Sequence, residues 1–481
     1  MLRFAASLLA LALAVPLVSI PLVTIPLAAT ATAASPYEER YAAGLSTPRE
    51  DSYYPDKGDP GIDTLHYGLD LTWLRRARQL RGKAEIEFRA TTSDSQFQLD
   101  LAGSMNVRRV TVDDHVVPFT HTGKTLFVRS PVAANSQYTV AIEYRGTPSP
   151  AKGPASRSDI AKVGMRVTKD GQLWTMQEPF GAFTWYPSND QPSDKAMYDV
   201  KVDVPGTWVG VSNGRMTHRS TVNGRTVTEW TNANPMSSYL VTIGVGPYKR
   251  YRQSGPHGLP MTYWVPRNRP ELVEPLLRTP AAVRWLEQRL GPYPFDRIGV
   301  LVTPSGSAME TQNLITFGVK NYRYGARQVR RTIVHELAHQ WYGDSVTPND
   351  WRDVWMNEGM ATYQDTRWAV AQGWTTWRSW QREWAQDDQF WRDIYGPPGA
   401  YDRGEFASIN VYYCAALMWD RLRLKLGTTA FNRLVRAWPQ VRAHRDSNQS
   451  RATIIGWIEQ RTGRELSGFF SKWLTSQKSP A

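Results

Sequence analysis

Two histidines and a glutamate form the segment of this chain best able to do chemistry. The segment HELAH begins at His335 and ends at His339. On a helix, residues four positions apart lie on one face, so both imidazoles can reach one metal ion at about 2.0–2.1 Å. With eight histidines in 481 residues, this pattern should arise by chance in on the order of 1% or less of chains this long. The spacing predicts a zinc site; the alternative is a pair of solvated or capped histidines on a helix face.

A third ligand is needed, because a catalytic zinc ion holds three protein ligands and leaves one position for water. The segment WMNEGMATY supplies Glu358. Eighteen residues separate it from His339, which is enough for a loop and a return onto a second, antiparallel helix. Two histidines and a glutamate are a ligand set that zinc peptidases use. We therefore expect one Zn²⁺ per chain, bound by His335, His339 and Glu358.

Glu336, inside the segment, is predicted to act as a base. Its side chain is rotated about 100° from that of His335 around the helix, so it cannot easily be a ligand. Zinc lowers the pKa of its bound water to about 7, and a neighbouring carboxylate can take the proton. We expect the resulting hydroxide to attack a carbonyl, and Glu336 to pass the proton to the leaving amine. The oxyanion that forms needs zinc and one further donor.

A β-rich domain is predicted to precede these residues. Between residue 65 and about residue 250, apolar and polar residues alternate, as in half-buried strands. The alternating segments are residues 65–73, 83–90, 97–103, 108–114, 137–144, 198–205 and 238–246. Turn signals such as SNG and GKT separate them, so we expect sheets that pack on each other.

The second half of the chain changes to helical spacing. Residues 279–290 form a helical pattern that ends at the Gly and Pro residues of GPYPF, and a short apolar strand is predicted over residues 297–304. Further helical patterns cover residues 327–344, 357–372, 411–427 and 451–463. These patterns predict an α+β domain with a helical tail, and they place both zinc-ligand segments on helices.

At this point the sequence resembles the aminopeptidase N family of zinc metallopeptidases, within the gluzincins. The segment HELAHQWYGDSVTPNDWRDVWMNEGMATY, residues 335–363, is similar to the zinc signature of that family throughout. Weaker similarity extends to residues 185–205, 290–302 and 466–474, in the form found in short, secreted bacterial members. The resemblance covers residues 60–475.

The resemblance implies an α+β multidomain fold. Residues 35–250 would form an antiparallel, saddle-like β-domain. Residues 251–481 would form a thermolysin-like zinc catalytic domain followed by C-terminal helices. The long C-terminal helical domain of larger members is expected to be absent.

The resemblance also implies a substrate-binding edge at SAMET, residues 307–311. Glu310 matches the glutamate that binds the free α-amine of the substrate, and Ala308 and Met309 precede it on the same edge. Ser307 and Thr311 replace the Gly and Asn of the family motif, so backbone docking and side-chain preference are open. Without the resemblance, Glu310 would be a solvated acid in a loop.

A second amine contact is implied at MQEP, where Glu178 matches the acid of the family's Gln-x-Glu segment and Met176 stands where Gln is usual. An ammonium group that has lost its water needs negative charge beside it, so two carboxylates facing one amine would stabilise its charged form. Such a site would explain exopeptidase action, because the interior of a peptide offers no cation there. The alternative for Glu178 is a structural acid next to Pro179.

The oxyanion donor of the family is a tyrosine, which Tyr412 matches in the segment VYYCAALMW. A phenol can donate to an oxyanion without titrating at neutral pH. Tyr413 is the rival candidate, and core packing is the alternative for both. Cys414 and Ala415 replace the Lys and Gly of the family segment. Cys414 is the one cysteine of the chain, so no intrachain disulfide can form, and we expect it to be a small buried residue.

The net charge is +13, which predicts a soluble basic surface. The more specific alternative is a surface that associates weakly with anionic cell-wall polymer or membrane. Nucleic-acid binding is not expected, because the arginines are scattered and no recognition motif accompanies them.

The first 34 residues predict a signal peptide. Arg3 is followed by a long apolar run and an Ala-Thr-Ala cleavage pattern that ends at Ala33. Pro16, Pro21 and Pro26 interrupt the run, which argues against a stable spanning helix. We expect a secreted protein without stable membrane insertion. An uncleaved N-terminal anchor and a wrongly placed start codon are the alternatives.

Three functions remain open from the sequence. The first is a secreted, monomeric zinc aminopeptidase that acts on peptides with a free N-terminus. The second is a zinc endopeptidase with the same metal chemistry. The third is a binding scaffold on a peptidase fold, which the intact set of predicted site residues argues against.

Overall fold

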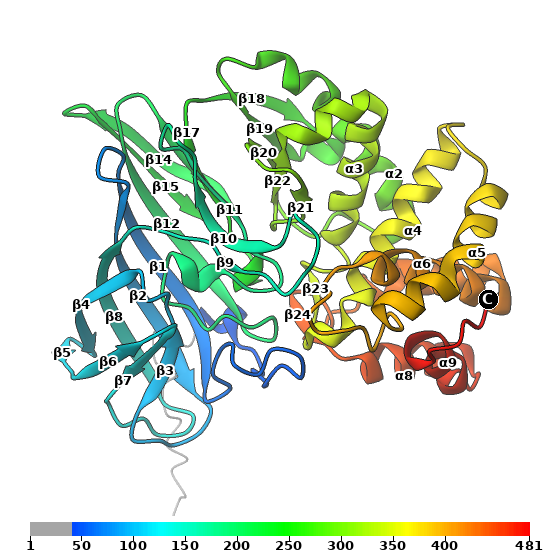
Figure 1. The fold of residues 1–481 in the computed structure, drawn as a ribbon, viewed down its shortest axis with the longest axis horizontal. Helices are drawn as coiled ribbons and strands as arrows, with labels where there is room; N and C mark the ends of the chain where they lie inside the picture. The colour runs from blue at the N-terminus through cyan, green and yellow to red at the C-terminus, as the bar shows by residue number, and fades with distance from the viewer. Residues whose placement is uncertain (1–40) are drawn as a thin grey trace, which may run out of the picture.

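The computed structural model describes residues 41–481 (Figure 1). The predicted signal peptide and its cleavage site near Ala33 lie outside the described residues. Within residues 41–481, none of the helices combines the length and the apolar character that crossing a membrane requires.

The N-terminal domain is built on a large, twisted sheet with the strand order β14-β15-β12-β1-β2-β8-β4-β5, and β16 pairs with β12. Its strands are β1 (Ile62–Leu74), β2 (Gln79–Ala90), β4 (Met105–Val112), β5 (His115–Val116), β8 (Gln137–Gly146), β12 (Lys195–Pro205), β14 (Arg215–Val222), β15 (Arg225–Thr231) and β16 (Met236–Ser237). All pairs are antiparallel except β1 with β12, which run parallel. Parallel neighbours need a long crossover, and residues 75–194 supply it.

Two smaller sheets pack with the large one. They have the orders β3-β7-β6 and β13-β17-β11-β10-β9. Their strands are β3 (Phe97–Asp100), β6 (Phe119–Thr122), β7 (Thr125–Val128), β9 (Ala151–Lys152), β10 (Lys162–Val167), β11 (Leu173–Met176), β13 (Val209–Ser212) and β17 (Ile243–Gly246). Large aromatic side chains, such as Trp73, Trp185 and Tyr198, are fully buried in the shared core. The predicted packing of sheet on sheet is confirmed.

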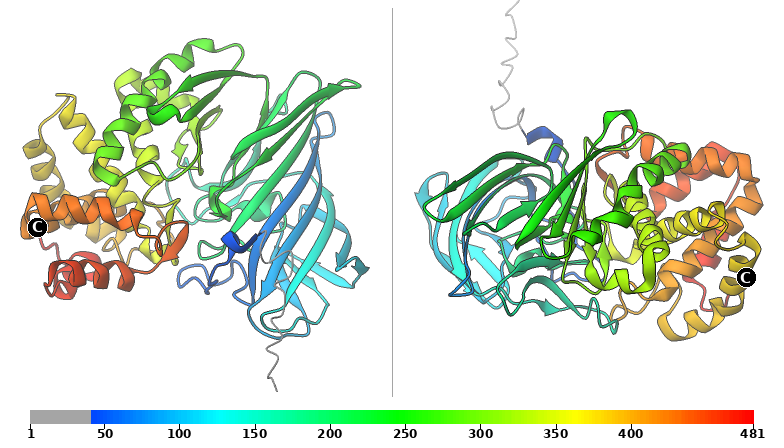
Figure 2. Two further views of the ribbon diagram at one scale, coloured as in Figure 1. Left: turned by 180° about the vertical axis from the view of Figure 1, so that it is seen from behind. Right: turned by 90° about the horizontal axis from the view of Figure 1, so that it is seen from above.

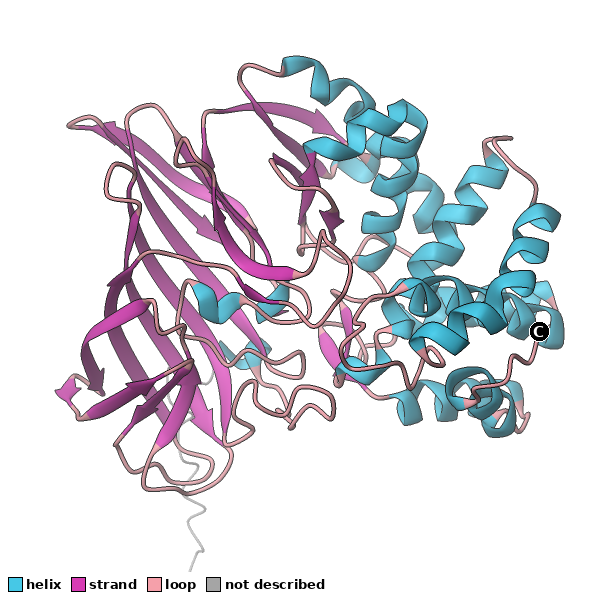
Figure 3. Ribbon diagram, viewed as in Figure 1, coloured by secondary structure: helices cyan, strands magenta, loops and turns pink. Residues whose placement is uncertain are grey.

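The C-terminal domain combines one five-stranded sheet with helices (Figures 2 and 3). The sheet has the order β18-β19-β20-β22-β21, from β18 (Tyr248–Ser254), β19 (Pro260–Pro266), β20 (Ile298–Thr303), β21 (Ala308–Met309) and β22 (Leu314–Gly318). A small pair joins β23 (Val346–Pro348) to β24 (Ser447–Gln449). The helices are α2 (Thr279–Leu290), α3 (Gly325–His339), α4 (Trp355–Ala371), α5 (Trp377–Tyr395), α6 (Ile409–Leu426), α7 (Thr428–Ala437), α8 (Arg451–Thr462) and α9 (Ser467–Thr475).

One predicted helix is too long. The sequence pattern predicts a helix over residues 327–344, but α3 ends at His339. Gly343 has φ of 142°, a backbone conformation that L side chains rarely adopt. The chain therefore turns after His339, and the N–H of Asp344 donates to the His339 carbonyl at 2.9 Å.

Buried polar contacts join the two domains beside α3. Lys195 on β12 donates from Nζ to the carbonyls of Asp344 (2.6 Å) and Ser345 (3.1 Å). The hydroxyl of Thr242 lies 3.0 Å from that of Thr316 on β22. A buried polar group is stable only when it is hydrogen-bonded, so these contacts hold the β-domain in one position against the helical domain.

Candidate active site

The three predicted zinc ligands lie together on two facing helices. His335 and His339 are on the last two turns of α3, and Glu358 is in the first turn of α4. Glu358 Oε2 lies 3.1 Å from His335 Nε2 and 3.4 Å from His339 Nε2. Two donors that each lie about 2.0–2.1 Å from a tetrahedral zinc ion are roughly 3.3–3.4 Å apart. The donor set and its spacing therefore fit zinc.

The second ring nitrogen of each histidine has its own partner, which fixes the ring. His335 Nδ1 lies 3.1 Å from Asp365 Oδ2, and His339 Nδ1 lies 3.2 Å from the Tyr342 carbonyl. Arg331 donates to the other oxygen of Asp365 at 2.9 Å. With the Nδ1 atoms occupied, both Nε2 atoms are free to bind a metal, as in many zinc sites.

A second group of potential ligands overlaps the first. Glu310, Glu336 and His339 also bring ligand atoms within 4.8 Å of one another. That group has a single histidine, whereas His335, His339 and Glu358 present two Nε2 atoms to one carboxylate oxygen. The first group is the better zinc site, which leaves Glu310 and Glu336 beside it.

Electrostatics in the site reflect its burial. Burial raises the pKa of Glu336 to about 8. Burial also acts to raise the pKa of Glu358, but His339 and His335 outweigh it and hold that pKa below its usual range. Burial acts to lower the pKa of His335, yet the contacts with Asp365 and Glu358 raise it well above its usual value. A metal held by His335 and His339 would require both imidazoles to be neutral, so its binding would release those protons.

Every residue that the sequence analysis predicts for the site lines one cleft. The cleft lies between the two domains and has a volume of about 680 Å³. Its lining includes His335, Glu336, His339, Glu358, Glu310, Glu178, Ala308, Met309 and Tyr412. Segments that are far apart in the sequence thus meet at one place.

Glu310 and Glu178 face the cleft with unused hydrogen-bonding capacity. Their exposed fractions are 3% and 9%. In each, Oε1 is buried and has no hydrogen-bond partner among the described residues. Burial, followed by the charge of Glu310, raises the pKa of Glu178 well above its usual value, and burial raises that of Glu310. Two carboxylates with free oxygens form a site for a cation.

Tyr412 and Tyr413 lie side by side at the start of α6 but differ in their contacts. The Tyr412 ring stacks on the His335 ring at 6.0 Å between centroids, and its hydroxyl accepts a hydrogen bond from Arg157 Nη1 at 3.1 Å. Burial, followed by the charge of Glu358, raises the pKa of Tyr412 well above its usual value, so the phenol keeps its proton. The Tyr413 ring packs against Trp391 at 5.2 Å. Cys414 is buried and free, as expected.

Three residues around the site were not identified from the sequence. Asp365 lies seven residues after Glu358 on α4, so it shares a helix face with that ligand, and this spacing could have revealed it. Gln340 donates to the Glu310 carbonyl at 2.8 Å and accepts from the N–H of Asn313. Arg157 comes from a loop of the N-terminal domain, and no local pattern marks it.

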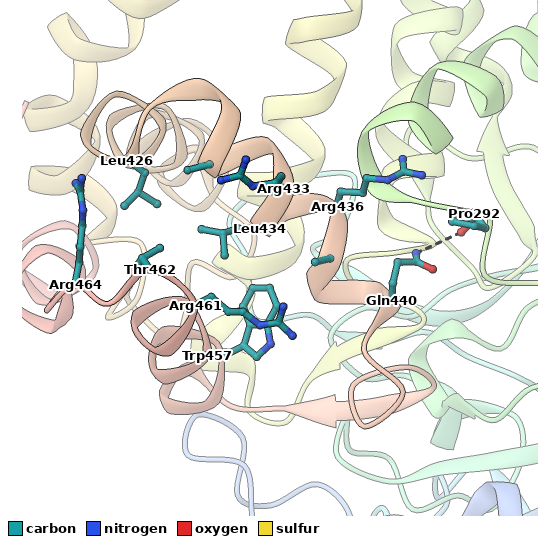
Figure 4. A pocket seen from close by; sticks show the side chains of 12 residues that line it. Pro292, Leu426, Arg433, Leu434, Arg436, Gln440, Trp457, Arg461, Thr462 and Arg464 are labelled. Atoms are coloured by element: carbon teal, nitrogen blue, oxygen red, sulfur yellow. Dashed lines mark hydrogen bonds between the residues drawn. The ribbon is translucent and has the colours of Figure 1, made fainter.

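A second groove lies between α7 and α8 (Figure 4). It has a volume of about 800 Å³ and shares no lining residue with the cleft. Its charged lining residues are Arg433, Arg436, Arg461 and Arg464, around Leu434 and Trp457. None of them offers a metal ligand, so the groove cannot hold zinc.

Comparison with known families covers both domains. The Peptidase M1 N-terminal domain matches residues 63–240, and the Peptidase family M1 domain matches residues 278–473. Together they cover well over half of the chain.

Curated relatives include two aminopeptidases. Aminopeptidase N of Streptomyces lividans is 27% identical over 342 residues, which is 64% of this chain and 38% of the relative. Glutamyl aminopeptidase of Rattus norvegicus is 27% identical over 248 residues, which is 48% of this chain and 26% of the relative. The chain thus spans well under half the length of these relatives.

Solved structures match over nearly the whole chain. A mutant M1 zinc metallopeptidase from Deinococcus radiodurans, bound to a Tyr-Ser-Ala substrate, has a TM-score of 0.78 and 27% identity. The match covers 90% of this chain and 98% of that one. A two-domain M1 zinc metallopeptidase bound to L-tryptophan has a TM-score of 0.80, with the same identity and coverage. The resemblance found in the zinc signature and the two-domain fold is confirmed: the chain belongs to the M1 family of zinc metallopeptidases.

Proposed function

We propose that this protein is a zinc aminopeptidase that removes N-terminal residues from peptides. One observation carries the proposal. Two buried carboxylates, Glu310 and Glu178, each leave an oxygen without a partner in the same cleft as the His335, His339 and Glu358 cluster. Unpaired buried charge is costly, and a substrate α-ammonium would pair both groups at once.

One Zn²⁺, held by His335, His339 and Glu358, would supply a water of lowered pKa and polarise the scissile carbonyl. Glu336 accepts the proton of the attacking water and transfers it to the leaving amine. Burial raises the pKa of Glu336, and the positive charge of a bound metal would lower it again, toward the ionised carboxylate that accepts a proton. Tyr412 keeps its proton and donates a hydrogen bond from its hydroxyl to the oxyanion of the tetrahedral intermediate.

Amine recognition sets where the peptide is cut. With the α-ammonium between Glu310 and Glu178, the first peptide bond would lie next to Glu336, because carboxylate oxygens of Glu310 and Glu336 lie within 4.8 Å of each other. Ala308 and Met309, on β21, would contact the backbone of the bound residue. An acetylated N-terminus carries no positive charge and would leave both carboxylates unpaired.

The similar proteins support this activity. Two relatives are named aminopeptidases, and the structure from Deinococcus radiodurans holds a tripeptide. The endopeptidase alternative predicts no role for the charge of Glu310.

The test is the variant Glu310→Gln, which keeps the shape and removes the charge. Truncating one partner of a buried charge pair costs about 2–5 kcal/mol, so kcat/KM for peptides with a free N-terminus should fall roughly 30-fold or more. Glu274→Gln, an exposed glutamate before α2, is the matched control. Unchanged trimming by Glu310→Gln would refute the proposed amine site.

We also propose that the protein is exported, with cleavage near Ala33, and acts as a monomer outside the cell. The signal pattern of residues 1–34 supports export. Mass spectrometry of the mature N-terminus checks the cleavage site. An intact N-terminus in the membrane fraction would support the anchored alternative.

The groove of Figure 4 supports a proposed association with anionic cell-wall polymer. Within residues 41–481, none of its four arginines forms an ion pair with a carboxylate, and Arg433 and Arg461 make no side-chain hydrogen bond. Residues 421–464 hold ten Lys and Arg but two acids. Unpaired guanidinium groups around one groove attract phosphate groups, which they can bind through two parallel hydrogen bonds.

The measurement is retention on a phosphodiester-linked polymer as a function of salt. The double variant Arg433→Gln and Arg461→Gln should weaken retention more than Arg108→Gln with Arg109→Gln, an exposed pair on β4 with the same charge change. Retention should fall as salt rises, because exposed charges are screened over about 8–10 Å. Equal losses in both double variants would mean that net charge alone is responsible.

A further inference from the structure

We propose that Arg157 is a positioning residue, which directs the hydroxyl proton of Tyr412 toward the reacting carbonyl. The inference rests on the proposed role of Tyr412 as oxyanion donor. It assigns a part in the reaction to the N-terminal domain, because Arg157 lies in the loop between β9 and β10.

The contacts of Arg157 hold its guanidinium in one orientation. Nη1 donates to the Tyr412 hydroxyl at 3.1 Å and to the Ala407 carbonyl at 2.6 Å. Nη2 donates to Asp159 Oδ2 at 2.8 Å, and Nε donates to Asp159 Oδ1 at 3.3 Å. The bidentate pair with Asp159 and the carbonyl contact leave the guanidinium little freedom to turn away from the phenol.

The chemistry of the pair decides which oxygen donates. An arginine side chain has five N–H donors and no acceptor, so the phenol oxygen must accept from Arg157. Among the described residues, no side chain or carbonyl accepts a hydrogen bond from the Tyr412 hydroxyl. The phenol proton is therefore free, and the cleft is the space into which it can point.

The same contact makes the phenol a better donor. A cation that donates to the phenol oxygen draws electron density from the O–H bond, as in other charge-assisted hydrogen bonds. The arrangement exists before substrate binds, so no reorganisation is needed when the oxyanion forms. A water molecule in place of Arg157 could also accept the proton and turn it away.

Arg157 is not the only attachment of its loop. The N–H of Phe406 donates to the Pro154 carbonyl at 2.8 Å, and Ser156 Oγ donates to Glu405 Oε2 at 2.6 Å. These contacts join the loop to the segment before α6 without involving Tyr412. The loop should therefore stay in place when Arg157 is replaced.

The experiment is a double-mutant cycle between Arg157→Met and Tyr412→Phe, with zinc content and Tm measured for each variant. Removing one oxyanion donor typically lowers kcat about 10²–10³-fold, and we expect that loss for Tyr412→Phe. Arg157→Met should lower kcat roughly 10-fold or more with little change in KM. In the Tyr412→Phe background, Arg157→Met should have almost no further effect.

Controls separate a positioning role from a structural one. Arg157→Lys keeps one cationic donor and should restore part of kcat, and Ser156→Ala removes a loop contact and should leave kcat unchanged. Equal losses from Arg157→Met in both backgrounds would show a structural role and overturn the inference. If Tyr412→Phe lowers kcat and Arg157→Met does not, the inference alone fails. If Tyr412→Phe leaves kcat unchanged, the proposed role of Tyr412 fails as well.

Discussion

The cleft and the groove between α7 and α8 use charge in opposite ways. The two are similar in size, at about 800 Å³ for the groove and about 680 Å³ for the cleft. Its four arginines are exposed; Arg433 and Arg436 lie on α7, Arg461 lies on α8, and Arg464 follows the end of α8. In the cleft, Glu336, Glu310 and Glu358 are at most 6% exposed, and they come from three separate segments of the C-terminal domain. Volume alone therefore does not identify the cavity for catalysis.

The two cavities differ in how much free energy it costs to leave their charged groups unpaired. An exposed arginine keeps its hydrating water. The folded state therefore loses little free energy when that arginine has no acidic partner. A buried carboxylate loses its water and must be neutralised or paired. Several such groups around one space, two of them with unpartnered oxygens, destabilise the folded chain unless ligands complete them. The buried carboxylates thus favour a metal and a cation in the cleft, whereas the exposed arginines favour anions in the groove.

The largest expected effect is that of zinc removal, which should change the function of the cleft and leave that of the groove unchanged. A chelator should lower peptidase activity more than roughly 100-fold, because the metal provides several kcal/mol of stabilisation to the transition state. Added Zn²⁺ should restore it. Retention on anionic polymer should not change, since the groove holds no ligand for a metal. Activity that survives complete metal removal, verified by elemental analysis, would contradict the assignment of the cleft.

The next largest effect is expected from Glu336→Gln. Loss of the base should lower kcat about 10²–10⁴-fold, while zinc content stays at that of the wild type because Glu336 is not a ligand. Steady-state kinetics with elemental analysis measures both, with Glu274→Gln as control. A variant that kept full turnover would show that another group accepts the proton.

Asp365→Asn tests the contact that orients His335. Replacing a carboxylate that supports a metal-bound histidine typically costs 10–100-fold in metal affinity or activity, and Arg331 would keep an acceptor but lose the negative charge beside it. Competition with a chelator measures the zinc affinity of the variant and of the wild type. Asp393→Asn, an exposed aspartate on α5, should have no effect. An unchanged zinc affinity in Asp365→Asn would mean that α3 alone fixes the orientation of the His335 ring.

The smallest effect concerns a histidine whose charge is paired within the protein. His66 lies between Glu87 (2.7 Å) and Asp199 (3.1 Å), far from the cleft in sequence. Burial acts to lower the pKa of His66, but the two carboxylates outweigh it and raise the pKa. A raised pKa means that His66 stabilises the fold fully below its unfolded pKa of about 6.5, and that this stabilisation is lost as pH rises through the folded pKa.

His66→Gln should therefore lower the free energy of unfolding by about 1.5–3 kcal/mol below pH 6.5, and by less at higher pH. Denaturant unfolding at several pH values measures the difference from the wild type. His115→Gln, an exposed histidine on β5, is the control. A difference that grew with pH would have the wrong sign.

Local spacing predicted the part of the site that lies on single helices. His335 and His339 are one turn apart, and α2 has the predicted bounds. The aromatic spacing of Trp377, Trp380 and Trp384 also marks α5, although the sequence analysis did not identify that helix. Arg157 could not be predicted in this way, because its contact with Tyr412 depends on how two domains dock. The end of α3 at His339 was missed because the residues that follow it still have helical spacing. The turn depends on Gly343, which lies four residues further on.

The central claim is tested by one paired assay on the purified mature protein. The same peptides are offered with free and with acetylated N-termini, each with and without a chelator. The account predicts chelator-sensitive release of N-terminal residues from free peptides alone. Equal cleavage of acetylated peptides would contradict the amine site formed by Glu310 and Glu178, and would identify a zinc endopeptidase instead.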